Sequence, residues 1–450
     1  MNFPGPQRLY HWAILLPPPM VLWIGVDDTD SLRGMCTTFL ATEFVREITK
    51  DLDLIGHPRL VRLNPNIPWK TRGNGAIAMA VGWGLGDPHP IGRIGETEVR
   101  AYPRGVPGGE PKEILERLSP LVERWSDLSQ EGTEPGLVVL SRKPASSLYW
   151  HAVRGIVTKA EATRATKGCG LTRTWKGGRG LIGASAACSW RPRDRTWEVL
   201  AYRERSRWGT RREVTRQSVV AMDQRFPHTF NNYDFENDRV VIAPRTPCPV
   251  LLGIRGDRPD DLPHALEMLR TEPSDRWLVF LTNQGTDEHL SPNPSPLPYH
   301  GGRYRGIVSR GPRSLRGGHV VFGLGAWDVT VYEHAKQFRQ VARALVPGDI
   351  VEVIGSIRDH PRTINAEKLH VVTLTTLVRK VSNPICLRCG DRTKSAGTDA
   401  PFRCPRCGSH FAKSSATYRR VERLIREGWY GPPAGSRRHL SKPLKRGIPA

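Results

Sequence analysis

Residues 21–38 read VLWIGVDDTDSLRGMCTT, an apolar run that ends in three closely spaced carboxylates, Asp27, Asp28 and Asp30. The apolar run predicts a buried strand, and the apolar positions in residues 37–50 predict the helix after it. Carboxylates this close repel one another unless a divalent cation or strong donors offset their charge. We therefore expect a magnesium-bound polyphosphate at the end of this strand. The alternative is an acidic strand-to-helix junction in which an aspartate caps the helix.

A basic loop follows this strand and helix. Residues 59–76 read RLVRLNPNIPWKTRGNGA and include Arg62, Lys70 and Arg72. Prolines stiffen the loop and glycines let backbone amides approach an anion, so the sequence predicts a phosphate clamp that faces the acidic turn. A Walker loop, GxxxxGK[ST], occurs nowhere in the chain. A surface loop with solvated cations is the alternative.

A second glycine-rich stretch, WKGGRGLIGASAA at residues 175–187, precedes a helix of small residues. Glycines at a helix N-terminus favour anion binding, and Arg179 adds a forked donor for phosphate. A flexible turn before a closely packed helix explains the same pattern equally well.

Acidic and aromatic residues are interleaved in residues 194–213 and 229–236. Asp194, Glu198 and Asp234 lie there among Trp and Tyr, a composition suited to a cationic amine, which charge and cation–π contact would hold. Taken singly, each of these acids is also explained as a solvated surface carboxylate.

Four cysteines near the C-terminus form the pairs CLRCG and CPRCG. Each Cys-x-x-Cys turns two thiolates toward one ion, and the glycine after each pair permits the tight turn of a zinc knuckle. Two disulfides are the alternative, but the other four cysteines show no pairing pattern and the chain lacks a secretory context. We therefore predict zinc bound by Cys386, Cys389, Cys404 and Cys407.

Strands and helices alternate in the N-terminal part, which predicts an α/β layer. A Gly/Pro-rich insert at residues 84–111 is expected to interrupt this layer, and the helix after it is expected to break or kink at Pro120. A second α/β unit is expected at residues 146–260. Short alternating segments in residues 276–376 predict a small antiparallel barrel of the OB type, which binds single-stranded nucleic acid. Candidate stacking aromatics in the barrel are Trp277, Tyr304, Phe322 and Tyr332.

The charge balance indicates a polyanionic partner. The 450 residues contain 67 Lys and Arg against 44 Asp and Glu, a net charge of +23. The excess is concentrated at the C-terminus, because residues 411–450 alone have a net charge of +8. The acidic turn is therefore expected to do something other than grip a nucleic-acid backbone.

Residues 1–19 contain a short apolar run followed by three prolines, which is too short for a signal peptide or a membrane helix. We expect these residues to be a leader or a misassigned start, with Met20 as the true first residue. No other run is long enough to span a bilayer, so we expect a cytoplasmic protein.

These stretches, together with YRERSRWGT, TFNNYD and APRTPCPVLLGIRGD, resemble the archaeal tRNA(Ile) 2-agmatinylcytidine synthetases from Met20 to about residue 410. The resemblance implies a multidomain α/β plus β protein. Its implied parts are a kinase-like α/β catalytic domain at 20–145, a ferredoxin-like α+β domain at 146–265 that contributes to the agmatine site, an OB-fold at 270–380, a zinc ribbon at 381–425 and a basic tail at 426–450.

The resemblance also implies the reaction. Agmatine is attached to carbon-2 of the cytidine at position 34 of the minor isoleucine tRNA, whose anticodon is CAU, so that AUA is read as isoleucine. ATP first phosphorylates oxygen-2 of the cytosine, and the amine then displaces phosphate. The family also phosphorylates its own threonine after the Met-Cys pair, which is Thr37 here. The implied cofactors are ATP, Mg²⁺ and Zn²⁺.

A non-catalytic protein that binds RNA or single-stranded DNA through the barrel and ribbon is the competing interpretation. The acid cluster argues against it, because a protein that only binds a polyanion gains nothing from three adjacent carboxylates.

Overall fold

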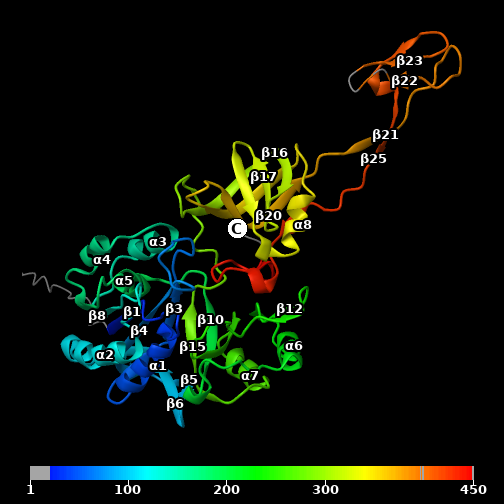
Figure 1. The fold of residues 1–450 in the computed structure, drawn as a ribbon. Coiled ribbons are helices and arrows are strands. Elements are labelled where there is room, and N and C mark those ends of the chain that lie inside the picture. Colours follow the sequence, from blue (N-terminus) through cyan, green and yellow to red (C-terminus); the bar gives the residue numbers. More distant parts are fainter. Residues whose placement is uncertain (1–20, 396, 398–399, 448–450) are drawn as a thin grey trace, which may run out of the picture. The chain divides into compact units, whose positions relative to one another are not determined.

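The computed structural model of the chain describes residues 21–395, 397 and 400–447, which divide into two compact units (Figure 1). The first unit contains the residues up to Ser291 together with those from Arg437 onward. The second unit contains residues Pro292–Ser436. The predicted leader at 1–19 lies outside the described residues. Within the described ranges, none of the helices has the length and apolar character that crossing a membrane requires.

A 13-stranded sheet forms the frame of the first unit, with β1 (Leu22–Asp27) between β4 (Gly75–Leu85) and β8 (Gly136–Leu140). The main path runs β11-β14-β10-β15-β5-β6-β2-β4-β1-β8-β9, and β3 and β7 pair beside it. The remaining strands are β2 (Asp53–Ile55), β3 (Arg59–Arg62), β5 (His89–Ile94), β6 (Thr97–Tyr102), β7 (Arg104–Val106), β9 (Gly170–Thr174), β10 (Thr196–Arg203), β11 (Thr229–Phe230), β14 (Val250–Gly256) and β15 (Ser274–Thr282).

The two faces of this sheet bury different helices. On one face Leu22, Ile24 and Val26 of β1 pack in a core with α1 (Thr37–Ile48) and α2 (Pro111–Trp125). On the other face lie α3 (Ser146–Arg154), α4 (Lys159–Thr166) and α5 (Gly180–Ser189), which share a core with Trp23. The alternation of side chains along β1 therefore points Asp27 toward the face that α5 covers.

Three sequence expectations for this region need correction. Residues 84–111 do not interrupt the sheet, because they form β5, β6 and β7 within it. Pro120 lies inside one continuous helix, α2, so the helix is not broken there. The predicted border at residue 146 falls within the α/β layer, because α5 packs against β1, β4 and β8, and β9 pairs with β8.

The rest of the first unit is built on β10, β14 and β15, whose apolar residues share a core with α6 (Arg216–Arg225) and α7 (Asp261–Glu267). A small hairpin of β12 (Tyr233–Asp234) and β13 (Arg239–Val240) lies beside them in the chain. β15 was expected to start the barrel and instead pairs with β10, β5 and β3. The alternation of apolar residues along β15 would suit the large sheet of the first unit and the barrel equally well. The sequence pattern therefore could not show which of the two sheets contains β15.

The second unit contains the expected barrel. Strands β16 (Gly301–Ser314), β17 (Val320–Leu324), β18 (Trp327–Val331), β19 (Ile350–Ile357) and β20 (Ile364–Thr373) form one sheet, which closes where β18 pairs with β20. α8 (Phe338–Arg343) contributes Phe338 and Ala342 to its core. Phe322 is buried in that core and cannot stack on a base, whereas Tyr304 and Tyr332 are only partly buried.

The chain leaves the barrel by β21 (Val378–Ser382), which pairs with the returning β25 (Thr417–Arg420). Between them, a three-stranded sheet of β22 (Lys394–Ser395), β23 (Phe402–Arg403) and β24 (His410–Phe411) carries the cysteine pairs. The expected basic tail at 426–450 is divided in two. β26 (Gly428–Tyr430) pairs with β20 of the barrel, and the residues from Arg437 onward belong to the first unit.

Candidate active site

A cavity of about 660 Å³ lies in the first unit. It is lined by the end of β1, the start of α1, the basic loop after β3, the N-terminus of α5 and strands β10 and β14. All but two of the predicted chemical residues of this unit are among its lining residues, namely Asp27, Asp28, Asp30, Thr37, Arg62, Lys70, Arg72, Arg179 and Glu198. The structure therefore brings together segments that are far apart in the sequence.

Asp27 is positioned by an unusually close approach of β1 and α5. A Cβ atom on Gly183 would lie 1.8 Å from Asp27 Oδ2, and one on Gly180 would lie 2.5 Å from the Asp27 carbonyl oxygen. A Cβ on Gly25 would likewise meet the backbone of Ala184 at 2.5 Å. The small-residue helix is therefore explained by this contact, since any side chain at Gly183 would occupy the space of the Asp27 carboxylate.

The neighbouring acids turn away from the regular strand. Asp28 has a φ of +61°, a left-handed conformation that ends the extended backbone of β1. Its Oδ2 accepts a hydrogen bond from the Glu134 backbone amide at 3.3 Å, and the Thr133 hydroxyl donates to the Asp30 carbonyl oxygen at 3.0 Å. The segment before β8 thus holds the acidic turn in place.

Burial disfavours ionisation of all three acids, and repulsion by neighbouring acids adds to this effect at Asp27 and Asp28. Burial and the nearby Asp28 and Asp30 raise the pKa of Asp27 well above its ordinary value. Burial, with Asp30 next, raises the pKa of Asp28 to about 7. Burial also raises the pKa of Asp30, although the charge of Arg72 opposes this. A bound divalent cation would stabilise the ionised carboxylates and offset the cost of their burial. The cluster is therefore suited to bind Mg²⁺.

The three carboxylates do not form a closed cage. In the part of the chain that the structure describes, the four cysteines are the sole group of metal-type ligands whose atoms converge within 4.8 Å. Mg²⁺ usually takes only one or two protein carboxylates and completes its shell with water and substrate phosphates. The acidic turn fits that open arrangement.

Thr37 is the first residue of α1 and lies in the cavity wall. Its side chain is buried, and its Oγ1 accepts a hydrogen bond from the Thr29 hydroxyl at 3.0 Å. The N-cap residue Cys36 makes no side-chain capping hydrogen bond, so Thr37 is not explained as part of a capping motif. Its hydroxyl lies where the helix dipole favours a negative group.

The predicted phosphate-binding cations differ in their surroundings. Arg72 donates to the carbonyl oxygens of Ser31, Gly34 and Met35, the last at 3.0 Å, and its Nε lies 3.7 Å from Asp30 Oδ2. Its guanidinium is therefore largely used in holding the acidic turn. The sequence indicated a phosphate ligand at Arg72, and the structure makes it first a support of the acids.

Other cations leave more of their charge available to the cavity. Lys70 Nζ donates only to the Ile67 carbonyl, at 3.0 Å, and burial lowers its pKa. Arg179 lies 4.9 Å from the ring of Trp69, which is half exposed at 50%. Arg62 donates to the Gly73 carbonyl at 3.3 Å, whereas its buried Nε has no hydrogen-bond partner among the described residues.

Of the three acids predicted to hold an amine, only Glu198 lines the cavity. It lies on β10 with 1% of its surface exposed, and its Oε1 is 2.8 Å from Arg255 Nε. Gln284 donates to its other oxygen.

The other two acids lie outside this lining. Asp194 pairs with Lys442 at 3.3 Å and Arg446 at 3.0 Å. Asp234 accepts from the Asn237 side chain at 3.0 Å. Both carboxylates are thus engaged elsewhere in the first unit, and composition alone could not reveal these partners.

Sequence reasoning missed several residues of the cavity wall. Glu134 adds a fourth carboxylate near Asp28, and its position just before β8, at the sheet edge where β1 ends, was the signal that could have found it. Arg255 on β14 lies in the stretch APRTPCPVLLGIRGD, but no chemical role was predicted for it. His439 lies far along the chain, and nothing in the sequence marks it as part of this unit.

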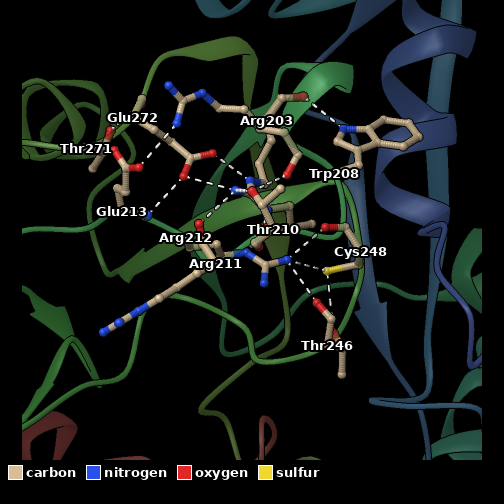
Figure 2. A network of polar contacts seen from close by, with 12 residues as sticks. Arg203, Trp208, Thr210, Arg211, Arg212, Glu213, Thr246, Cys248, Thr271 and Glu272 are labelled. Atoms are coloured by element: carbon tan, nitrogen blue, oxygen red, sulfur yellow. Dashed lines mark hydrogen bonds and ion pairs between the residues drawn. The ribbon is translucent and has the colours of Figure 1, made fainter.

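A buried polar network supports one wall, as Figure 2 shows. Arg203 binds Glu272 through its Nε at 2.6 Å, and Glu272 accepts from the Glu213 backbone amide at 2.9 Å. The adjacent Arg212 donates to the carbonyl oxygens of Thr246 at 3.0 Å and Cys248 at 2.8 Å. Because Thr246 and Cys248 line the cavity, this network fixes the loop that encloses it.

The zinc prediction is supported by the geometry of the second unit. The Sγ atoms of Cys386, Cys389, Cys404 and Cys407 converge, and all eight cysteines of the chain are free of disulfides. Gly390 and Gly408 have φ values of +72° and +75°, as the knuckle turns require. Their amides donate to the carbonyl oxygens of Cys386 and Cys404 at 2.9 and 3.0 Å. These residues make a tetrathiolate zinc site.

Comparison with known proteins matches both units. Three family models match: the TiaS TCKD domain over residues 23–175, the TiaS FLD domain over 178–289 and the TiaS C-terminal zinc ribbon domain over 383–425. The chain is 40% identical over 442 residues to the tRNA(Ile) 2-agmatinylcytidine synthetase TiaS of Archaeoglobus fulgidus, covering 95% of this chain and 98% of the relative.

Solved structures agree with this match. The fold is similar to that in a complex of TiaS with its isoleucine tRNA and ATP, with a TM-score of 0.82, 38% identity, and coverage of 95% of this chain and 98% of that chain. It is also similar to that in a complex of TiaS with the same tRNA, AMPCPP and agmatine, with a TM-score of 0.78, 36% identity, and coverage of 95% and 97%.

Proposed function

The chain belongs to the family of tRNA(Ile) 2-agmatinylcytidine synthetases, and we propose that it uses ATP to attach agmatine to the cytidine at position 34 of the isoleucine tRNA with a CAU anticodon. The observation that carries this proposal is the single cavity that combines the acidic turn, the basic loop and Glu198. A protein that only bound RNA would have no use for buried carboxylates whose ionisation costs free energy. Acting on tRNA, the enzyme works in the cytoplasm.

ATP is the phosphoryl donor, and we assign its polyphosphate to the region between the acidic turn and the basic loop. Asp27, Asp28 and Asp30 would hold Mg²⁺, whose charge offsets that of the phosphates. Lys70, Arg62 and Arg179 supply cations around the same space, and Arg72 keeps the acidic turn in position. Thr37, at the N-terminus of α1, is the proposed site of phosphorylation by ATP alone.

The reaction on RNA has two stages. A phosphoryl group is transferred to oxygen-2 of the cytosine, which converts a poor leaving group into phosphate. The primary amine of agmatine then attacks carbon-2, and phosphate departs with the electrons of the carbon–oxygen bond. The cavity's part is to align these groups and to stabilise negative charge as it develops. The target base must leave its stack, which bases of an anticodon loop do readily.

Agmatine is a dication at neutral pH, and Glu198 is the acid we retain for it. Its carboxylate lies in the cavity wall beside Arg255, so that a bound guanidinium or ammonium group would compete for the same oxygen. Replacement of Glu198 by Gln should raise the KM for agmatine and leave ATP-dependent phosphorylation of Thr37 intact. An unchanged KM would place the agmatine site elsewhere in the cavity.

The second unit serves RNA binding in this proposal. We assign its closed barrel to the OB-fold class, the ribbon to a tRNA grip, and the two parts of the first unit to the kinase-like and ferredoxin-like domains. The barrel supports the first assignment because it has five strands that close on themselves and presents Tyr304 and Tyr332 only partly buried.

Nucleoside analysis tests the function directly. The CAU-anticodon isoleucine tRNA is incubated with the protein, ATP and agmatine, digested, and examined by mass spectrometry for the agmatine adduct of cytidine. We expect the adduct with the native chain and at least about a hundredfold less with Asp28→Asn, because charge stabilisation is lost. Asp87→Asn, an exposed acid after β4, is the matched control and should be fully active. Full activity of Asp28→Asn would contradict the site, and no adduct with native protein would contradict the function.

A further inference from the structure

The C-terminal segment, Arg437–Arg446, belongs to the first unit although the 145 residues before it form the second. Leu440 has 1% of its surface exposed and joins the core on the α5 face of the sheet. The backbone is paired as well, since the Gly285 amide donates to the His439 carbonyl at 2.8 Å and the Asp287 amide donates to that of Leu440 at 2.9 Å. The segment is therefore an integral part of the catalytic unit.

Basic side chains fasten the segment on both sides of Leu440. Arg446 binds Asp257 at 2.7 Å and Asp194 at 3.0 Å, and Lys445 donates to the Thr229 carbonyl at 2.8 Å. On the other side, Arg437 donates to Asn231 Oδ1 at 2.8 Å. These cations are occupied within the first unit, and Asp194 serves as an anchor for the segment.

His439 is thereby brought into the cavity wall. The residue is exposed, it lines the cavity, and its ring makes no hydrogen bond with the described residues. The ring lies close to Gly73 of the basic loop. A Cβ atom added to Gly73 would lie 3.1 Å from His439 Nε2 and 2.8 Å from Arg62 Nη1. The imidazole and the Arg62 guanidinium thus flank one point of the loop.

The charges around this point favour an anion. Arg62 has a buried Nε without a partner among the described residues, and Arg255 is also close enough to act on His439. The positive charge of Arg62 is the main cause that lowers the pKa of His439 well below its ordinary value, so the ring is neutral near pH 7. Glu198, the carboxylate of this region, is paired with Arg255. A neutral imidazole with a free N–H beside the guanidinium of Arg62 is suited to an oxyanion.

We propose that His439 is a substrate-binding residue that donates a hydrogen bond to the phosphoryl group during its transfer to, and departure from, the cytosine. The C-terminal segment holds this residue in the cavity. This inference rests on the proposed function for the identity of the phosphoryl group, but phosphate binding by His439 can be measured without any turnover. No proton transfer is required, because the imidazole donates its N–H without losing it.

The test uses the full-length protein and titrates it with inorganic phosphate as the probe, with thermal unfolding as the readout. His439→Ala should weaken phosphate binding about tenfold, the loss expected for a hydrogen bond to a charged group. His439→Gln, which keeps an N–H donor, should recover part of it. His264→Ala, an exposed histidine on α7, is the matched control and should bind phosphate as the native protein does.

Kinetics supply a second readout. In tRNA modification, His439→Ala should lower kcat per folded enzyme and leave the KM for agmatine unchanged, whereas a distorted site would change both. Leu440→Asp should weaken phosphate binding as much as His439→Ala, because it expels the segment from its core. If His439→Ala binds phosphate and turns over as the native protein does, the proposal is overturned. Native phosphate affinity in Leu440→Asp would overturn the role of the segment. If native protein modified no tRNA yet bound phosphate through His439, the function would fail and this inference would stand.

Discussion

At the scale of single residues, the acidic turn is the feature that the sequence predicted best. Three carboxylates at a strand end predicted a charged site, and the structure places all three in the cavity with raised pKa values. The amine-binding acids remain a prediction, and Asp194 and Asp234 have partners that only the folded chain brings near. Local composition shows which residue types are present, but long-range pairing decides which charges remain free.

The repulsion among these acids gives a test of the metal that needs no catalysis. At pH 8, above the Asp28 pKa of about 7, Asp28→Asn should raise the thermal unfolding midpoint of the ATP-free protein, because one buried charge is removed. The same variant should lose most of the rise in midpoint that Mg²⁺ gives the native chain. A native chain that Mg²⁺ does not stabilise would contradict the magnesium site.

Glu288 provides a pH prediction away from the cavity. Burial, which outweighs the hydrogen bonds from Tyr149 and Trp190, raises its pKa to about 7, and its Oε1 has no partner among the described residues. A carboxyl group whose pKa is raised by folding stabilises the fold below about pH 4.5, and this stability is lost as the pH rises through about 7. Native protein should therefore lose stability between pH 5 and pH 8 relative to Glu288→Gln, by on the order of 2 kcal/mol. Urea unfolding at both pH values measures this difference, and an equal pH dependence in the two proteins would exclude Glu288 as its source.

At the scale of elements, α5 shows how helix composition serves the site. The run GLIGASAAC predicted a closely packed helix or an anion site, and the structure shows the close packing directly, with Gly183 against Asp27. β15 shows the opposite case, since its alternating pattern fits two sheets and its true partners β10, β5 and β3 are distant in sequence. Periodicity specifies the type of an element but does not specify its neighbour.

Gly183→Ala tests the contact between α5 and β1. The added methyl group would lie 1.8 Å from Asp27 Oδ2, so either the helix or the carboxylate must move. We expect at least about a tenfold loss of tRNA modification and a destabilisation of about 1–3 kcal/mol. Gly311→Ala on β16 is the control, because its Cβ would meet only Pro347 Cδ at an ordinary 3.8 Å. Unchanged activity and stability in Gly183→Ala would show that Asp27 needs no such fit.

At the scale of the whole molecule, the distribution of positive charge differs from the sequence expectation. The excess in residues 411–450 suggested a free basic tail that grips tRNA, yet the cations of the C-terminal segment are bonded inside the first unit. We therefore assign the proposed tRNA contacts to the ribbon, where Arg388, Arg403 and Arg406 lie near the cysteine pairs. A chain truncated at Asn383 would lose the ribbon and His439 together, and its defects could not be separated.

Internal excision of the ribbon separates the two roles. Residues 378–420 can be replaced by a short Gly-Ser linker, because the Val421 amide already donates to the Leu377 carbonyl at 2.8 Å. We expect weaker tRNA binding with a shallower salt dependence, because phosphate contacts are lost, while ATP-dependent phosphorylation of Thr37 persists. Affinity and salt dependence equal to those of the native chain would refute the ribbon as a grip.

We propose that the cavity activates the cytosine by phosphorylation of its oxygen-2 before agmatine attacks. An isotope experiment tests this most directly, with isoleucine tRNA synthesised to contain ¹⁸O at oxygen-2 of the cytidine at position 34. After modification with ATP and agmatine, inorganic phosphate is isolated and examined by mass spectrometry. If oxygen-2 is phosphorylated first, the isolated phosphate should contain one ¹⁸O atom for each agmatine attached. Recovery of the label in water, with unlabelled phosphate, would contradict it.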